Sequence, residues 1–498
     1  MPLTAVEQLI LELVNRARLD PAGEAQRLNV GLNEGIEGGK ISAAPKDPLA
    51  SSDALHNAAD AHSQFMLDHD AFGHQGIGDG TPQSRIAAAG YSSPTMLGEN
   101  IAFRGTTGAV DENAFAVAMY RDLFVDKGID GRGHRLNILN SSFREIGVGE
   151  QTGVFSQGGN NFNSTTLTQD FGARNAAIFI AGVAITDAND NAFYDVGEGI
   201  GGIGVSVTAA ATTSGTTEAA GGYAVSYSGG PATVTFSGGG LAQPILVSVD
   251  AGTHNVKVDL LGPSLVGSSA STTLGSGAVD LMLLGAGNLN GTGNSDANTL
   301  TGTEGANVLD GAGGGDTLVG ARGHDVLTGG TGSDNFVFNG VKDSPAGVGR
   351  DQIVDFNSLE NDVVDLSADA NRRAAGDQDF HFIGAAKFHS HGTHHVFGEL
   401  RYANHVLKGD VNGWPRGFRD CNECRDPLGR AGRRLSPLNP PGLGIFRFAV
   451  EPVQRVQQAI GSAPGQYCIA GKSCRSFEMI VAAEALRAAL HSACAALA

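Results

Sequence analysis

The chain has 498 residues, which is too long for a single hydrophobic core, so several domains are expected. Its formal net charge of −19 argues against nucleic acid or an anionic membrane surface as the primary partner. No cysteine precedes Cys421, so stability outside the cell would rest on packing and metal ions there rather than on disulfides.

The N-terminal segment, MPLTAVEQLILELVNRARLDP, has the pattern of an amphipathic helix. Its apolar residues recur at helical spacing, at Leu9, Ile10, Leu13 and Val14. Two glutamates interrupt the apolar stretch and no basic leader precedes it, so a cleaved secretory signal is not expected. A second helix is predicted over residues 53–68, and no apolar run in the chain reaches transmembrane length.

Three motifs in residues 1–172 carry the polar chemistry: AFGHQG with His74, GENIA with Glu99, and GHRLNIL with His134. With ELVNRARLDP near the start, they resemble the signatures of the cysteine-rich secretory protein, antigen 5 and pathogenesis-related-1 (CAP) superfamily. The resemblance implies an α-β-α sandwich with a central cleft lined by these three residues. The family also has a second glutamate between the last two motifs. Only Glu112 lies in that interval here, in a context that does not match, so the fourth position stays unassigned.

Several uses of this cleft remain open. Two imidazoles and a carboxylate can make an open three-ligand zinc site, and the same groups can act as acid and base without a metal. They can also form a polar network that only supports the fold. Because the family implies no single chemistry, a lipid, a glycan or a cell-surface partner is a further alternative. We expect a binding protein rather than an enzyme.

Residues 173–262 lose helical periodicity, and alternating apolar residues predict a small antiparallel β-sandwich. The segment DANDNAFYDVGE spaces its oxygen donors as an EF-hand calcium loop does. The candidate ligands are Asp187, Asn189, Asn191, Phe193 through its carbonyl, Asp195 and Glu198. Ala192 stands where an EF-hand has glycine, so a turn without an ion is the alternative. The strands that follow resemble the calcium-binding B-type or prealbumin-like repeats of bacterial surface proteins, which implies a stalk or adhesive spacer.

A Ser/Gly/Thr-rich linker is expected over 263–284, and a β-roll over 285–340, where a nine-residue period runs from Gly293 to Val337. Its windows are GNSDANTLT, GTEGANVLD, GAGGGDTLV, GARGHDVLT and GGTGSDNFV. They fit the G-G-x-G-x-D-x-U-x pattern of a calcium-loaded parallel β-roll. Since each coil takes two windows, the residues at position six should stack in alternate pairs: Asp316 with Asp334, and Asn307 with Asp325.

The candidate calcium ligands of this roll are residues at position six and glycines of the turns. They are Asn307, Gly311, Gly314, Asp316, Gly320, Gly323, Asp325, Gly329, Gly332 and Asp334. A column of carboxylates without basic partners repels itself until a cation fills it. Calcium, which prefers carboxylate and carbonyl oxygens, suits such a column.

The nonapeptide windows and their flank, residues 341–413, resemble the repeats-in-toxin (RTX) family, whose members leave Gram-negative cells by type I secretion through an uncleaved C-terminal signal. The resemblance implies a roll that stays unfolded at low cytosolic calcium and folds outside the cell. Residues 414–498 depart from this acidic, glycine-rich style. We interpret them as an atypical tail, from a shifted reading frame or a recent fusion, and export would depend on whether this tail works as a signal.

These predictions describe a multidomain, secreted or surface-associated calcium-binding protein that carries a CAP domain. Two alternatives belong to other classes. One is a hydrolase or peptidase centred on the cleft residues His74, Glu99 and His134. The other is an adhesin in which the sandwich and the roll do the binding.

Overall fold

The computed structural model describes residues 2–366, apart from residues 40, 176 and 341, and several short segments beyond them. These segments are residues 381–382, 385, 390–391, 394–395, 399–403, 406–410 and 476–481. The chain divides into two compact units, Met1–Gly305 (unit 1) and Ala306–Ala498 (unit 2). Of the tail predicted at 414–498, only the strand at 476–481 lies within the described residues.

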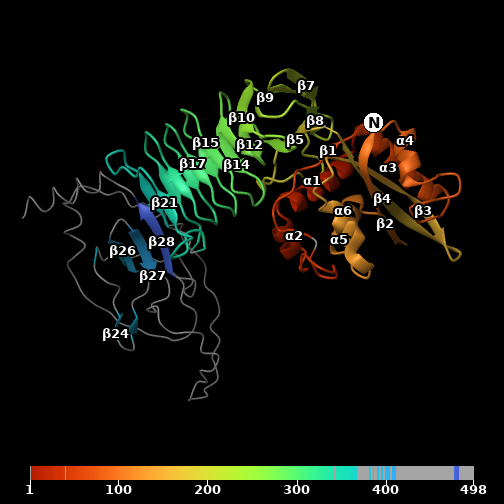
Figure 1. Ribbon diagram of the computed structural model, residues 1–498, viewed down its shortest axis with the longest axis horizontal. Helices are drawn as coiled ribbons and strands as arrows, with labels where there is room; N and C mark the ends of the chain where they lie inside the picture. The colour runs from red at the N-terminus through yellow and green to blue at the C-terminus, as the bar shows by residue number, and fades with distance from the viewer. Residues whose placement is uncertain are drawn as a thin grey trace, which may run out of the picture. The chain divides into compact units, whose positions relative to one another are not determined.

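The first part of unit 1 has three layers, with helices on both faces of a sheet (Figure 1). The strand order is β1-β3-β4-β2, with β3 and β2 antiparallel to β4 and β1 parallel to β3. Helix α3 packs against β3 and β4, whereas α5 and α6 pack on the opposite side. The elements are α1 (Ala5–Leu19), α2 (Pro21–Arg27), β1 (Ala50–Ser51), α3 (Asp53–Asp68), α4 (Pro82–Ala88), β2 (Pro94–Thr106), α5 (Glu112–Val125), the 3-10 helix η1 (Asp130–Arg132), α6 (Gly133–Ile138), β3 (Glu145–Gln157) and β4 (Asn160–Arg174).

Local signals explain where the first helix begins. Thr4 and Glu7 form a capping box, in which the Thr4 hydroxyl accepts from the Glu7 N–H at 3.2 Å. The Glu7 carboxylate in turn accepts from the Thr4 N–H at 2.7 Å, so two N–H groups that the helix leaves unpaired are satisfied. The apolar stripe of α1 is buried, with Ile10 and Val14 fully so. The predicted helix over 53–68 is confirmed as α3.

The rest of unit 1 consists of strands in two sheets. One sheet has the order β15-β13-β10-β9-β6-β7 and the other β16-β14-β12-β11-β5-β8. Neighbouring strands from β5 to β11 are antiparallel except β5 and β11, which are parallel. The strands are β5 (Phe179–Ile185), β6 (Ile203–Thr208), β7 (Thr212–Thr216), β8 (Gly222–Ser226), β9 (Pro231–Gly238), β10 (Ile245–Asp250), β11 (Val256–Leu261), β12 (Leu265–Ser268), β13 (Ser271–Leu274), β14 (Asp280–Leu283), β15 (Asn290–Thr292) and β16 (Thr299–Thr301).

These strands share a hydrophobic core with the first three layers. Val183, Ile185 and Leu261 belong to the same buried cluster as the residues of α1. A buried ion pair also joins the two parts, because Lys257 Nζ lies 2.9 Å from Glu12 Oε2. Residues 173–262 are therefore packed into unit 1 and do not form the separate stalk that the B-type resemblance implied.

The segment expected to be a linker, 263–284, differs from that prediction because it contains strands β12, β13 and β14. β12 pairs antiparallel with β11, and β14 pairs parallel with β12. Serine, glycine and threonine made this segment look flexible. The apolar residues between them, such as Val266, Leu274 and Leu281, are buried, and they supply the driving force for strand pairing.

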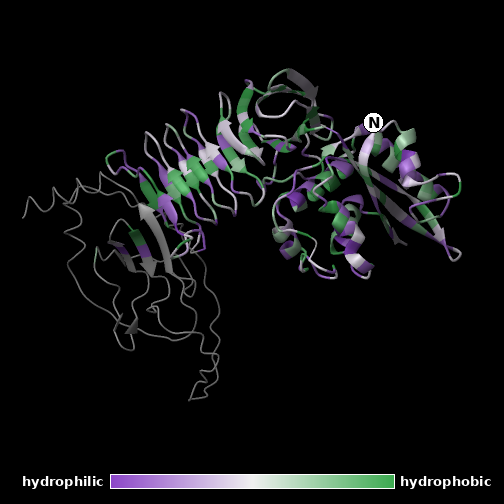
Figure 2. Ribbon diagram, viewed as in Figure 1, coloured by the Kyte–Doolittle hydropathy of each residue, from purple (hydrophilic) through white to green (hydrophobic). Residues whose placement is uncertain are grey.

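Unit 2 begins with short strands that pair in parallel, β17 with β19 and then β21, and β18 with β20 and then β22. The strands are apolar and their connecting turns hydrophilic (Figure 2). The strands of unit 2 are β17 (Val308–Asp310), β18 (Thr317–Val319), β19 (Val326–Thr328), β20 (Asn335–Val337), β21 (Asp351–Ile353), β22 (Val363–Asp365), β23 (His381–Phe382), β24 (Ser390–His391), β25 (His394–His395), β26 (Glu399–Ala403), β27 (Val406–Asp410) and β28 (Ser476–Val481).

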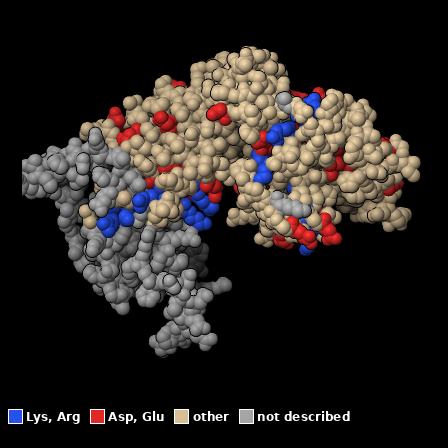
Figure 3. All heavy atoms as spheres, in the orientation of Figure 1, with Lys and Arg blue, Asp and Glu red and all other residues tan. Residues whose placement is uncertain are grey.

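The surface carries the negative charge of the sequence. Acidic side chains are spread over the turns of the nonapeptide strands on the face seen in Figure 3. Within the residues that the structure describes, no helix combines the length and hydropathy needed to cross a membrane.

Candidate functional site

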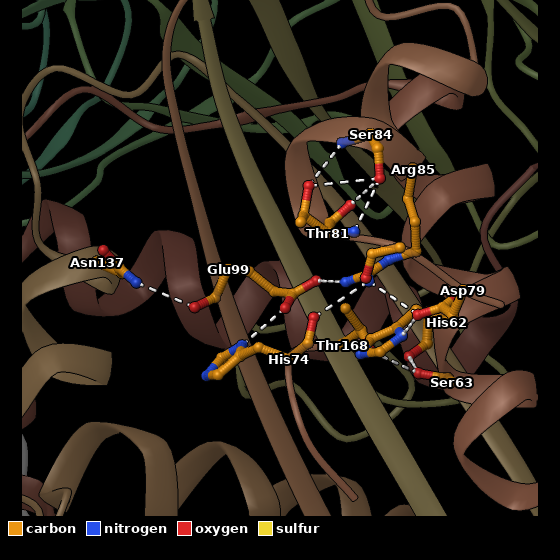
Figure 4. A network of polar contacts seen from close by, with 12 residues as sticks. His62, Ser63, His74, Asp79, Thr81, Ser84, Arg85, Glu99, Asn137 and Thr168 are labelled. Atoms are coloured by element: carbon orange, nitrogen blue, oxygen red, sulfur yellow. Dashed lines mark hydrogen bonds and ion pairs between the residues drawn. The ribbon is translucent and has the colours of Figure 1, made fainter. Parts of the chain in front are cut away.

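His74 and Glu99, two of the three predicted cleft residues, are joined directly. His74 Nδ1 lies 2.7 Å from Glu99 Oε1, and the other oxygen of Glu99 accepts a hydrogen bond from Arg85 (Figure 4). Arg85 also donates to Asp79 Oδ2 at 2.8 Å, and the same oxygen lies 2.7 Å from His62 Nδ1. Five ionisable groups thus form one continuous network around Glu99.

The elements of the fold bring these groups together. Glu99 lies on β2 at one edge of the sheet, and His62 comes from α3. Arg85 comes from α4, whose N-cap is Thr81, and the Thr81 hydroxyl accepts from the Ser84 N–H at 3.2 Å. Burial alone would raise the pKa of Glu99, but the His74 hydrogen bond and the Arg85 charge lower it below its ordinary value. Glu99 is therefore held as a carboxylate.

Asp170 lies directly opposite Glu99 in the pairing of β2 with β4. Its side chain is fully buried, and neither carboxyl oxygen has a hydrogen-bond donor from the described residues. Burial raises the pKa of Asp170 well above its usual range, and the nearby Glu99 carboxylate adds to this effect. The pKa values of these two adjacent carboxyl groups are thus shifted in opposite directions, that of Glu99 downward and that of Asp170 upward.

His134, the third predicted residue, has a different carboxylate partner. Its Nδ1 lies 2.8 Å from Asp126 Oδ1, and its backbone N–H donates to Asp126 Oδ2 at 2.9 Å. Asp126 is buried at the end of α5, in a left-handed conformation with φ of 54°. From the sequence, only a glutamate was considered for the interval between Glu99 and His134. In the structure the carboxylate that contacts His134 belongs to Asp126, which is placed there because α5 ends next to it.

The GEN and GHRLN motifs are tied together by amides. Asn100 Nδ2 donates to the His134 carbonyl at 3.2 Å, and Asn137 Nδ2 donates to the Glu99 carbonyl at 3.2 Å. Asn137 also donates to Asn100 Oδ1 at 2.9 Å. The strand that carries Glu99 and the helix that carries His134 are therefore held to each other next to the site.

This arrangement suits acid–base chemistry or ligand contact better than zinc binding. The His74 and His134 side chains are 48 % and 22 % exposed, and each uses Nδ1 for a carboxylate, which leaves Nε2 for a ligand or a proton. Throughout the described parts of both units, no three His, Cys, Asp or Glu side chains are grouped to hold a metal ion. The zinc prediction therefore gains no support, because the two imidazoles are directed to separate carboxylates.

In the nonapeptide region the predicted alternate pairing is confirmed: Val308 pairs with Val326 and Thr317 with Asn335. The apolar residues two positions after position six are fully buried. They are Leu300, Leu309, Leu318, Leu327 and Phe336. Each window therefore buries the apolar residue of its strand and has its position-six residue just before that strand.

Asp325 and Asp334 each accept a hydrogen bond from a backbone N–H two windows earlier in the chain. Asp325 Oδ1 accepts from the Asn307 N–H at 2.8 Å, and Asp334 Oδ1 accepts from the Asp316 N–H at 2.9 Å. Their Oδ2 atoms are buried and have no hydrogen-bond partner among the residues that the structure describes. Burial raises the pKa of Asp325 to about 7, although the Asn307 hydrogen bond opposes this shift. Desolvated carboxylate oxygens of this kind require a cation or a proton.

The turn glycines leave room for these oxygens. A Cβ on Gly320 would lie 2.5 Å from Asp325 Oδ2, and one on Gly329 would lie 2.3 Å from Asp334 Oδ2. Gly332, with φ of 139°, adopts a backbone conformation that side chains rarely allow. Carboxylate oxygens beside turn carbonyls are the donor set that calcium prefers, so the residues present fit this ion. The same positions in the other windows are Gly311, Gly314 and Gly323.

Two further aspartates, outside the nine-residue period, continue the same columns. Asp351 Oδ1 accepts from the Asp325 N–H at 2.8 Å, and Asp362 Oδ1 accepts from the Asp334 N–H at 3.0 Å. Burial raises the pKa of Asp351 to about 8. The sequence analysis missed both because their separations from the preceding aspartates exceed the two-window repeat. The available signal was their location at the start of β21, for Asp351, and just before β22, for Asp362.

The loop with the predicted EF-hand spacing is closed by its own side chains. Glu198 accepts from the Ala188 N–H at 2.9 Å and the Asp195 N–H at 3.1 Å. Asp187 accepts from the Asn191 N–H at 3.0 Å, and Ala192 has φ of 54° at the position where an EF-hand has glycine. The Asn189 and Asn191 amides both donate to Asp195 at 2.8 Å. Phe193 lies under Arg16 of α1, whose guanidinium is 4.8 Å from the ring centre.

Comparison with known families agrees with this description of the two regions. Residues 11–171 match the model of the cysteine-rich secretory protein family (CAP), and residues 292–327 and 310–343 match the RTX calcium-binding nonapeptide repeat. Residues 11–171 thus belong to the CAP family, and residues 292–343 carry RTX calcium-binding repeats. The RTX repeats imply that the chain binds calcium.

One curated relative is the uncharacterized protein YkwD of Bacillus subtilis, which is 35 % identical over 147 residues. The alignment covers 30 % of this chain and 43 % of that protein, so the chain spans less than half of the relative's length.

Two solved structures are similar to 35 % of the chain. One is an extracellular protein containing an SCP domain from Bacillus anthracis, with 22 % identity, a TM-score of 0.22 and 45 % of that chain covered. The other is an outer surface protein from Borrelia burgdorferi, with 14 % identity, a TM-score of 0.22 and 96 % of that chain covered.

Proposed function

We propose that this chain is a secreted or surface-associated calcium-binding protein in which the parallel strands of unit 2 complete a β-roll when calcium enters the turns. The observation that carries the proposal is that the Oδ2 atoms of Asp325 and Asp334 lie buried beside turn glycines, with no hydrogen-bond partner in the described part of the chain. The CAP domain and the RTX repeats together fit a calcium-binding, extracellular protein.

The proposed role of calcium follows from the cost of burying carboxylates. Without an ion, folding must desolvate a column of acidic groups, and the free-energy cost of this desolvation favours the unfolded chain. Binding at a site that is absent from the open chain adds its free energy to folding. A chain with this property would remain open at low cytosolic calcium and fold where calcium is abundant, which suits export by a type I secretion system.

We propose that the CAP domain is a binding module. Glu99, its most buried cleft residue, has both oxygens occupied by His74 and Arg85, so it is better suited to holding neighbouring side chains than to attacking a substrate. The exposed edges of His74 and His134 are the groups left for a ligand, which we place among lipids, glycans and cell-surface molecules. The hydrolase alternative, centred on His74, Glu99 and His134, stays a prediction.

Adding calcium to the chelator-treated full chain should increase its β structure, with a midpoint from about 0.1 to 1 mM, as for extracellular modules. Circular dichroism measures this change, because the strands of unit 2 are then stabilised by the ion. Magnesium serves as the control ion, since it demands six near-octahedral ligands and retains its water. An unchanged spectrum across the calcium titration contradicts the proposal.

The loop 187–198 is proposed as a separate calcium site of unit 1. Replacing Glu198 by alanine should weaken calcium binding there at least about tenfold, because this residue supplies the twelfth-position carboxylate. Glu198→Gln is the matched control, since it retains an acceptor for the Ala188 N–H but removes the charge. Calcium-dependent hydrogen exchange in peptides covering 187–199 reports this site alone. If the unaltered loop shows no response to calcium, the turn without an ion is the correct interpretation.

A further inference from the structure

At the start of the nonapeptide array, side-chain amides bind the main-chain carbonyls of the turns. Asn298 Nδ2 donates to the Val279 carbonyl at 2.7 Å. Asn294 Nδ2 donates to the carbonyls of Gly275 and Ala278, at 3.0 and 2.8 Å. These donors place hydrogen atoms against carbonyl oxygens at turns of the kind where a calcium-binding repeat places a cation.

The orientation of both amides is determined by their surroundings. Asn298 Oδ1 accepts from the Asn294 N–H at 2.8 Å, and Asn294 Oδ1 accepts from the Asp296 N–H at 2.8 Å. Each oxygen therefore faces a backbone donor, and each nitrogen faces carbonyl acceptors. An aspartate at 298 would keep the first contact but would direct its second oxygen at the Val279 carbonyl, where two acceptors repel each other.

The hydroxyl of Thr303 has a similar role in the next window. Its Oγ1 donates to the Gly287 carbonyl at 2.6 Å, and it accepts from the Gly305 N–H at 2.9 Å. Strands β15 and β16 of this segment pair with β13 and β14, which pair in turn with other strands of unit 1. This part of the array is thus hydrogen-bonded within unit 1 by groups of the chain itself.

The windows of Asp325 and Asp334, in unit 2, have the opposite chemistry at the same position. Asp325 and Asp334 use Oδ1 for a backbone N–H, as Asn298 does, but none of the described residues donates to their buried Oδ2 atoms. An amide carries its own donor, whereas a carboxylate needs an added cation in the same place. An asparagine at position six therefore stabilises its turn without an ion, whereas an aspartate at position six requires calcium.

We propose that the array is divided into a calcium-independent section, which includes the Asn298 window, and a calcium-binding section that begins after it and contains Asp325 and Asp334. The inference rests on the proposed calcium binding of unit 2 and specifies which repeats take the ion. The calcium-independent section would remain folded with unit 1 in chelator, and it would give the chain a folded segment immediately before the part that orders on calcium.

Hydrogen exchange of the full chain, in chelator and in millimolar calcium, tests this division. Peptides covering 290–303 should be equally protected in both conditions, and peptides covering 316–337 should gain protection only with calcium. If both segments lose protection together in chelator, the division is refuted while calcium binding stands. If peptides covering 316–337 show no response to calcium, the proposed function itself fails.

Two substitutions at one position distinguish an amide that replaces a cation from an amide that merely packs. Asn298→Asp should increase exchange of 290–303 about tenfold or more in chelator, because it opposes two acceptors, and calcium should restore protection. Asn298→Ala should also increase exchange in chelator, but calcium should not restore it, because no carboxylate is present. Equal behaviour of the two variants in calcium overturns the assignment.

Discussion

Replacing Arg85 by methionine is expected to lower the unfolding free energy of the CAP domain by about 3–5 kcal/mol, the usual cost of leaving a buried charge without its partner. The Arg85 side chain is only 6 % exposed, and it donates to both Asp79 and Glu99. Methionine preserves most of the volume but removes the positive charge. The variant therefore buries two carboxylates that retain only histidine partners, His62 and His74.

Arg104→Met is the matched control for this prediction. Arg104 pairs with Asp122 at 2.7 Å, a distance close to that of the Arg85–Asp79 pair, but the two side chains are 38 % and 58 % exposed. A solvent-exposed pair contributes about 0–1 kcal/mol, so this variant should lose little. The denaturant dependence of hydrogen exchange in β2 and β4 measures both changes locally. Similar small losses in the two variants would show that burial does not strengthen the Arg85 network.

Features set by local sequence were predicted well. The stripe Leu9, Ile10, Leu13 and Val14 is buried in α1, and the pattern over 53–68 corresponds to α3. The nine-residue period also predicted which windows pair, because a repeat of fixed length determines the register between coils. In each case the signal lies within the segment that folds.

Features that depend on distant partners were not predicted. Asp170 is unremarkable in the sequence, and its chemistry arises only because the pairing of β2 with β4 places it opposite Glu99. Asp126 becomes the partner of His134 because α5 ends at that residue. The strands within 263–284 were hidden by a serine- and threonine-rich composition, since their stability comes from pairing with β10 and β11. Motif spacing contains none of this information.

The same limit applies to the separation of unit 1 into modules. The resemblance of residues 173–262 to spacer repeats implied independence from the CAP domain. However, Lys257 is buried and forms ion pairs with Glu12 of α1 and with Asp259. A buried lysine needs such partners, so residues 173–262 and the CAP domain depend on each other to pair the buried charges of Lys257 and Glu12. Domain boundaries drawn from composition do not reveal this kind of dependence.

Replacing Asp170 by asparagine is expected to stabilise unit 1 progressively as the pH rises. Below pH about 4, the usual pKa of aspartate, the carboxyl group is neutral in both the folded and the unfolded chain, so the variant and the wild type should be similar. Above it, the unfolded chain releases the proton and the folded chain keeps it, because burial and Glu99 raise the pKa of Asp170. Wild-type stability therefore falls by up to about 1.4 kcal/mol per pH unit until the folded pKa is reached.

Asparagine removes this dependence because its side chain does not titrate. The other charged groups near Asp170 are Arg85 and Asp79. Both are retained in the variant, so they contribute equally to the two proteins.

Calorimetric unfolding of the full chain at about pH 4.5 and about pH 7.5 should show the variant gaining stability relative to the wild type as the pH rises. Asp122→Asn, at the exposed carboxylate that pairs with Arg104, is the control and should show no such gain. If Asp170→Asn follows the wild type at both pH values, Asp170 is not protonated in the folded protein, and the assignment of one proton to this carboxyl pair is wrong.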